Sequence, residues 1–358
     1  MPLAVKTRPC GSLAVGALPD GCRLCEQGAK MVLFVTGLCA YHCFYCPVNE
    51  EKMYRDGIFA NERPVLRDED VIEEARAMRA LGAGITGGDP LEVPDRVARY
   101  IRLLKAEFGE PFQTHLYTMT TDLEKIRTVA AGGLDEIRFH PPPGLWSRLD
   151  VSGFPAAVKE SRRLGMVVGF EVPLIPERSE DLKAMIAWAE KAKLDFVNLD
   201  EMEYSDANYA RLGVRGYKTK DEMSYGVAGA DAVAREILSA PHTITVHYCT
   251  SQYKDAWQLR ERIKRAATVA ANPWDVITED GTLIRGVIEA EDLPAMARSL
   301  REEFGVPAKL VAVNAGRRRV EIAPWVLEDI AADVAGRCYV VEEYPTSDGL
   351  EVSRQSLP

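Results

Sequence analysis

The chain has 358 residues, 47% of them hydrophobic, and a formal net charge of −10 at pH 7. This length and apolar content predict one large domain plus a small one and exclude wholesale disorder, and the acidic balance disfavours a nucleic-acid-binding or anionic-membrane surface. We find no signal peptide and no apolar run near the ~20 residues of a membrane helix, so we expect a cytoplasmic protein without a membrane partner.

Residues 1–30 are punctuated by proline and glycine, which predicts an irregular, cysteine-containing segment. The apolar run at 31–37 predicts a buried strand, and helical and strand patterns alternate from residue 70 onward. We expect further strands at 82–86, 113–119, 134–140, 166–175, 196–199 and 243–249, and helices at 70–81, 97–108, 123–131, 156–164, 182–192, 230–238 and 255–270. This alternation predicts about six or seven parallel β/α units, which suit a partial barrel better than a complete eightfold one.

A second domain is predicted after Pro273 and the turn at Asp280-Gly281. Strands are expected at 282–288, 309–313, 319–322 and 338–343, and helices at 293–304 and 325–334. This β-α-β-β-α-β order is typical of the ferredoxin-like α+β fold, a name that implies no cluster. The predicted divisions are therefore a segment at 1–30, a barrel at 31–272, a ferredoxin-like domain at 276–345 and a frayed polar tail at 346–358.

Eight cysteines are distributed unevenly, with six of them in the first 46 residues. A secreted disulfide scaffold is smaller and spreads its cysteines more evenly, so the clustering favours metal binding in a reducing compartment. Cys338 begins a strand of the small domain, where we expect it to be part of the core. The remaining cysteines are Cys10, Cys22, Cys25, Cys39, Cys43, Cys46 and Cys249.

Cys39, Cys43 and Cys46 lie in a loop directly after the first barrel strand, with a C-x3-C-x2-C spacing. Thiolates are soft ligands suited to iron or zinc. Three thiolates from one loop can hold three corners of a cubane iron–sulfur cluster, and a fourth would close the cluster for electron transfer. Three leave one iron open to another ligand.

This loop resembles the cluster loop of radical S-adenosylmethionine (SAM) enzymes, with a core like that of pyruvate formate-lyase activating enzyme. The resemblance implies an α/β fold with a partial (β/α)6-type barrel over residues 31–250, and a catalytic [4Fe-4S] cluster at Cys39, Cys43 and Cys46. In this family the open iron binds SAM, whose reductive cleavage gives a 5′-deoxyadenosyl radical. An external reductant such as ferredoxin or flavodoxin is implied, and Tyr45 matches the position beside the adenine.

A second motif, Gly87-Gly88-Asp89-Pro90, ends the second barrel strand. Glycines let the backbone approach a ligand closely, and a neighbouring acid can accept hydrogen bonds from an ammonium group. The motif resembles the Gly-Gly-Glu-Pro-like turn that holds the methionyl amino group of SAM, with Asp89 where glutamate is usual. The alternative is an ordinary turn at the end of a strand.

Two further polar residues are assigned to cofactor binding by counting strands. His140 ends the fourth strand and Glu171 lies within the apolar fifth strand. The resemblance places His140 approximately at the SAM site, because the carboxyl ends of barrel strands face the active site. An acid inside an apolar strand costs roughly 1–3 kcal/mol or more when unpaired, so Glu171 requires a cation, a hydrogen-bonding ligand or a water-filled lumen. The alternative for each is a satisfied structural polar group.

The other thiols predict a candidate second metal site. Cys10, Cys22 and Cys25 come from the N-terminal segment, and Cys249 ends the last barrel strand. Four thiolates suit tetrahedral zinc or a second [4Fe-4S] cluster. Alternatively Cys10 takes no part, a histidine at 242 or 247 completes the site, or Cys249 is a separate catalytic thiol.

The competing hypothesis is a non-catalytic iron–sulfur or zinc protein. It explains the thiols but leaves unexplained why the cysteine loop and the glycine turn follow successive strands. The substrate cannot be deduced from the sequence: a protein or peptide, a tRNA and a small molecule all remain open, although the acidic charge does not favour nucleic acid.

Overall fold

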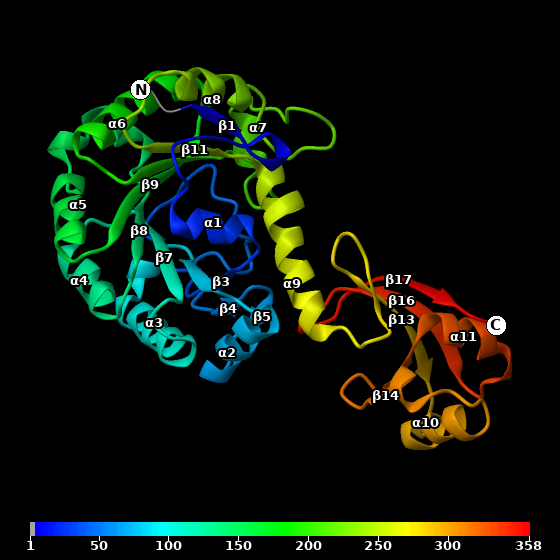
Figure 1. Ribbon diagram of the computed structural model, residues 1–358. Helices are drawn as coiled ribbons and strands as arrows, with labels where there is room; N and C mark the ends of the chain where they lie inside the picture. The colour runs from blue at the N-terminus through cyan, green and yellow to red at the C-terminus, as the bar shows by residue number, and fades with distance from the viewer. Residues whose placement is uncertain (1–3) are drawn as a thin grey trace. The chain divides into compact units, whose positions relative to one another are not determined.

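The computed structural model describes residues 4–358 and shows two compact units (Figure 1). The larger unit extends to Leu259, except for Ala77–Arg79, and the smaller unit contains those three residues and the chain from Arg260 onward. The division falls at the start of α9 (Arg260–Ala270), where a π-helical turn at Tyr253–Leu259 ends, and not at Pro273.

The larger unit is built on a curved sheet whose central part is parallel. Within residues 4–358, seven strands pair in parallel in the order of the chain, which confirms the predicted partial barrel. They are β3 (Lys30–Phe34), β6 (Gly82–Thr86), β7 (Gln113–Thr118), β8 (Glu136–Phe139), β9 (Val167–Leu174), β10 (Phe196–Glu201) and β11 (Thr245–Cys249). The sheet is open, because antiparallel strands extend both of its edges. These are β2 (Leu13–Val15) and β1 (Val5–Thr7) beside β11, and β4 (Phe59–Ala60) and β5 (Arg63–Pro64) beside β3.

Helices cover the convex side of this sheet (Figure 1). They are α2 (Asp68–Ala77), α3 (Pro94–Phe108), α4 (Leu123–Ala131), α5 (Phe154–Arg163), α6 (Ser179–Lys191) and α8 (Ala230–Ser239). In α3, Pro94 suits the first turn because its missing N–H has no partner there in any case. Gly109 ends α3 with a φ of 88°, a conformation that glycine adopts without strain. Val97, Ile101 and Leu104 form its buried face, so the apolar residues that repeat with a helical period in the sequence are those that pack against the sheet.

The N-terminal segment is more regular than predicted, and the prediction of irregular structure was wrong. It contains β1, β2 and a short helix, α1 (Asp20–Glu26), which lies on the concave side of the sheet (Figure 1). Gly21 in α1 allows this close packing, since a Cβ there would lie 2.5 Å from Arg138 Nη2 and 2.7 Å from His115 Nδ1. These elements are too short to produce a periodic sequence pattern. The helix α1 is stabilised by packing against side chains of the barrel interior.

The smaller unit has the predicted β-α-β-β-α-β order, with one short strand added before it and one strand after it. Its elements are β13 (Leu283–Glu289), α10 (Leu293–Glu302), β14 (Val311–Asn314), β15 (Arg319–Ile322), α11 (Pro324–Ile330), β16 (Arg337–Glu343) and β17 (Glu351–Ser356), with β12 (Val276–Ile277) beside β13. The antiparallel order β14-β15-β13-β16 is that of a split β-α-β fold. The expected frayed tail instead forms β17 along β16, and every residue of β17 is exposed, so no apolar pattern announced it.

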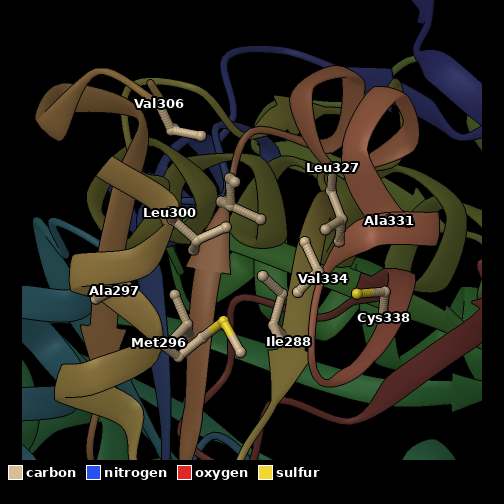
Figure 2. Packing of buried hydrophobic residues seen from close by; sticks show 11 residues of the cluster. Ile288, Met296, Ala297, Leu300, Val306, Leu327, Ala331, Val334 and Cys338 are labelled. Atoms are coloured by element: carbon tan, nitrogen blue, oxygen red, sulfur yellow. The ribbon is translucent and has the colours of Figure 1, made fainter. Parts of the chain in front are cut away.

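The core of this unit lies between its two helices and the sheet. Figure 2 shows Met296 and Leu300 from α10, Leu327 from α11 and Ile288 from β13 pointing toward one another. Cys338 is 4% exposed and belongs to this cluster, which confirms its assignment to the core.

Candidate active site

The cysteine loop follows the carboxyl end of β3 and has no regular secondary structure between residues 35 and 58. Its base is closed by hydrogen bonds between Gly37 and the turn at residues 54–55, from Gly37 N to Arg55 O and from Tyr54 N to Gly37 O, each 2.8 Å. Cys39, Cys43 and Cys46 are all half-buried free thiols. The loop therefore presents its three thiols on one irregular segment that is fixed at its ends.

The donor chemistry of this loop fits a cluster with three thiolate ligands. Burial, together with the nearby Asp89, Cys43 and Cys46, raises the pKa of Cys39 to about 11, so the three thiols lie within electrostatic range of one another. Within residues 4–358, no group of three or more Cys, His, Asp or Glu side chains is arranged to hold a metal ion. The thiols thus share one loop without forming a preassembled metal site.

The glycine motif joins β6 to the start of the cysteine loop. Gly88 N donates to Thr36 O and Asp89 N donates to Leu38 O, both at 2.8 Å. A Cβ on Gly87 would lie 2.3 Å from Thr36 O, and one on Gly88 would lie 2.3 Å from Leu38 O. The two glycines are thus required by the close approach of the backbone at residues 36–38, which follows β3.

The Asp89 carboxylate is buried and already has three donors from the chain. Its oxygens accept from Leu91 N at 3.0 Å, from Thr118 Oγ1 at 2.7 Å and from Met119 N at 2.9 Å. Burial nevertheless raises the pKa of Asp89. These bonds tie the end of β6 to the end of β7, a structural role that the sequence pattern did not indicate.

Tyr45 and His140 are brought together across the mouth of the barrel. The Tyr45 hydroxyl lies 2.9 Å from His140 Nε2. Burial lowers the pKa of His140 to about 4, so its ring is neutral near pH 7 and can accept the tyrosine proton. Nearby, Cys43 Sγ lies 4.0 Å from Met119 Sδ, so the end of β7 also borders the loop.

Glu171 has the cation that its position required. Arg138 Nη1 donates to its carboxylate at 2.6 Å, and Asn198 Nδ2 donates to it at 2.8 Å. Desolvation opposes its charge, yet Arg138 and these hydrogen bonds hold the pKa of Glu171 below its usual value. Arg138 also binds Glu136 through Nε at 2.6 Å, so a buried ion network crosses the barrel interior.

The remaining predicted ligands are distributed around α1 and β11. Cys22 Sγ accepts from Arg138 Nη2 at 3.4 Å and from Asn198 Nδ2 at 3.1 Å, and burial raises the pKa of this thiol to about 12. Cys249 is buried at the end of β11, and the Cys10 carbonyl accepts from Thr250 Oγ1 at 2.9 Å. The N-terminal segment therefore lies inside the barrel and along β11.

Sequence reasoning missed two residues after β10 whose side chains contact the cysteine loop. Asn208 precedes α7 (Tyr209–Val214), and Arg211 lies within it. Both side chains donate to carbonyls of the loop. They lie more than 160 residues away along the chain, in a stretch without a clear periodic pattern, and no sequence signal could have found them.

Comparisons with known proteins agree with this geometry. The model of the radical SAM superfamily matches residues 33–141, which include the cysteine loop and the glycine motif, and a "Domain of unknown function (DUF8061)" matches residues 281–357. Because a curated relative is 36% identical along nearly the whole chain, the protein belongs to the radical SAM superfamily. That relative is the "Putative glycyl-radical enzyme activating enzyme MJ0021" of Methanocaldococcus jannaschii, aligned over 95% of this chain and 93% of its own length.

Similar solved structures are more distant. SuiB of Streptococcus suis bound to its precursor peptide SuiA has 12% identity and a TM-score of 0.37, covering 72% of this chain and 56% of SuiB. Methylornithine synthase (PylB) has 14% identity and a TM-score of 0.40, covering 64% of this chain and 75% of PylB. The chain thus spans about half the length of SuiB.

Membership of the superfamily establishes the general chemistry. The protein is an enzyme that uses SAM and a [4Fe-4S] cluster. Of the helices in residues 4–358, none is long and apolar enough to span a membrane.

Proposed function

We propose that this protein is an activating enzyme, which uses SAM to remove a hydrogen atom from a glycyl residue of a partner protein. The observation that carries the proposal is the 36% identity, over 95% of the chain, to the relative named "Putative glycyl-radical enzyme activating enzyme MJ0021". An alignment over 95% of the chain includes most of the smaller unit, so the likeness is not confined to the barrel.

In this proposal Cys39, Cys43 and Cys46 are the ligands of the cluster. When bound, the cluster supplies the electron that cleaves SAM into methionine and a 5′-deoxyadenosyl radical. The half-buried loop limits access of water to the site, and its closed base holds the three thiols on one side of the barrel mouth. Support comes from their shared loop after β3 and from the family match to residues 33–141.

The residues around the loop have distinct roles in the proposal. Tyr45 lies by the adenine, with its hydroxyl oriented by His140 at 2.9 Å. Gly87, Gly88 and Pro90 bring backbone close to the methionyl end of SAM. Asp89 holds the ends of β6 and β7 in register through its three hydrogen bonds, so it acts on SAM mainly by positioning that backbone. In the same way Glu171 supports the barrel interior through its pairing with Arg138.

The proposal also includes an external reductant such as ferredoxin or flavodoxin, because a one-electron donor must reduce the cluster. The free thiols require a reducing compartment, which supports the cytoplasm as the place of action.

Anaerobic reconstitution tests the chemistry. The wild-type protein is expected to bind iron and sulfide, to change its electron paramagnetic resonance signal when SAM is added, and to form 5′-deoxyadenosine with dithionite. Cys39→Ala, Cys43→Ala and Cys46→Ala should each abolish that product, and Cys338→Ala, in the core of the smaller unit, should retain it. Wild-type cleavage in any loop variant, or a colourless zinc protein, would contradict the assignment.

Isotope transfer tests the substrate class. The partner is expressed in cells fed deuterated glycine and then incubated anaerobically with the enzyme and SAM. Deuterium should appear in 5′-deoxyadenosine, and a glycine-centred radical should appear in the partner. Cleavage of SAM without any transfer from labelled glycine would retain the radical SAM assignment and reject the activating-enzyme proposal.

A second metal site at Cys10, Cys22, Cys25 and Cys249 has weaker support. Burial raises the pKa of Cys22 and so opposes the thiolate that binds metal, whereas the hydrogen bonds that its sulfur accepts from Arg138 and Asn198 favour that thiolate. Iron, sulfide and zinc analysis of wild type and Cys249→Ala distinguishes the cases. One cluster requires about four irons per chain and two require about eight, and bound zinc would indicate the tetrahedral alternative.

A further inference from the structure

The segment that follows β10 packs against the backbone of the cysteine loop. Asn208 Nδ2 donates to Tyr45 O at 3.1 Å and also to Glu203 O at 2.9 Å. Arg211 donates through Nη1 to Cys43 O at 3.4 Å and through Nη2 to Cys46 O at 3.3 Å. Two side chains thus engage the carbonyls of three loop residues, two of which are proposed cluster ligands.

One face of α7 supplies these contacts. Residues 208, 211 and 215 are spaced so that their side chains lie on the same side of a helix. The Arg215 guanidinium carbon lies 4.5 Å from the centroid of the Phe44 ring. The same ring stacks on Tyr217, with 6.1 Å between ring centroids and 6° between planes. Phe44, one of the two aromatic residues between the second and third cysteines, is therefore held by the same segment.

The segment is itself anchored to the barrel, so it can act as a rigid support. Lys220 pairs with Glu201 of β10 at 2.6 Å, and the same carboxylate accepts from Ser251 N at 2.8 Å. Tyr204 donates its hydroxyl proton to Tyr217 O at 2.6 Å, which closes the two ends of the segment on each other. Asn208 is fully buried, so its amide has been removed from water and is committed to its two carbonyl partners.

We propose that Arg211 is a positioning residue of the cluster: its planar guanidinium fixes the peptides that carry Cys43 and Cys46, and its charge stabilises the reduced state. The inference rests on the proposed role of the three cysteines as cluster ligands. Arginine suits this task because its fork of donors has fixed geometry and its charge is permanent. A nearby cation favours the state with one more electron, because cluster potentials depend on net charge and on hydrogen bonds around the ligands. Asn208 supports the same loop without charge.

Three variants separate the two effects. Arg211→Ala should release iron to a chelator faster, with retention reduced about 10- to 100-fold, the range for partners that orient metal ligands. Its remaining cluster should have a more negative midpoint potential by redox titration. Arg211→Lys should preserve the potential but restore iron retention only in part, because an ammonium cannot engage both carbonyls in one plane. Asn208→Ala should accelerate iron loss and leave the potential unchanged.

The matched control is Arg162→Ala. Arg162 is an exposed arginine on α5 that also donates to a backbone carbonyl, Ala192 O at 3.2 Å, on the outer side of the barrel. Its variant should match wild type in iron retention and in potential. Thermal unfolding of the metal-free proteins checks that the variants fold, and if Arg211→Ala does not, Arg211→Lys and Asn208→Ala provide the same comparison.

The outcomes of the two proposals differ. A wild-type protein that binds no cluster rejects the proposed function. A wild-type protein with a normal cluster, together with Arg211 variants whose iron retention and potential equal those of wild type, rejects only the role of Arg211. A loss of iron without any shift of potential in Arg211→Ala would overturn the electrostatic part.

Discussion

Gly88→Ala is expected to destabilise the larger unit and to loosen the start of the cysteine loop. The new Cβ would lie 2.3 Å from Leu38 O and 2.6 Å from Gly37 O, whereas real Cβ contacts essentially never fall below 3.0 Å. Both neighbours are backbone atoms, so no side chain can rotate to relieve the overlap.

The magnitude follows from two contributions. Overpacking of a tight site costs about 1–3 kcal/mol, and the rigid neighbours at Gly88 place it in the upper part of that range. The displacement also strains the hydrogen bonds from Gly88 N to Thr36 O and from Asp89 N to Leu38 O, each worth about 1 kcal/mol. We therefore expect a loss of about 2–4 kcal/mol in the free energy of unfolding.

Urea denaturation of the metal-free protein measures this loss, and Gly213→Ala is its matched control. Gly213 lies in α7, and a Cβ there would meet nothing within 4 Å, so alanine should stabilise that helix by about 0.5–1 kcal/mol. The reconstituted Gly88→Ala protein should also lose iron faster than wild type. A Gly88→Ala protein as stable as wild type would refute the argument from close backbone approach.

Three further outcomes follow from buried groups. Arg138→Leu leaves the carboxylates of Glu136 and Glu171 in the barrel interior without their cation, so the free energy of unfolding measured by urea denaturation should fall by about 3–5 kcal/mol. A loss smaller than about 1 kcal/mol would contradict the stabilising role of this ion network. Burial lowers the pKa of His247 to about 4, so its imidazole binds a proton more readily in the unfolded chain than in the folded protein. The free energy of unfolding should therefore be unaffected by His247 above about pH 6.5 and should decline as the pH falls from there to about 4. His247→Gln should remove about 3 kcal/mol of that decline, and identical pH profiles would exclude it. Tyr45→Phe removes the hydroxyl bonded to His140, which should cost about 1 kcal/mol of stability and weaken SAM binding in equilibrium titration, whereas unchanged affinity would argue against a place for Tyr45 at the cofactor.

The alternation of strands and helices was readable in the sequence because it reflects local periodicity. The helix at α4 and the strand at β15 were predicted with their observed bounds, since each has a regular apolar pattern and clear turn signals. The strands β4 and β5 have two residues each, too few to show alternation, and the helices α1 and α7 have seven and six residues, too few to show a helical period, so none of the four was predicted.

The candidate site divides along the same line. The sequence determined the cysteine loop, its place after the first strand and the glycine turn after the second, because these depend on residue type and spacing within short segments. The tertiary structure alone decided that Asp89 is occupied by donors from β7, that Glu171 is paired with Arg138, and that Cys22 lies inside the barrel. Arg211 shows the reason most clearly: its contact with Cys43 spans 168 residues, and only the assembled sheet brings the segment after β10 to the loop after β3. Local sequence patterns reflect which face of each segment is buried. Contacts between residues this far apart depend on the order in which the strands pair in the sheet.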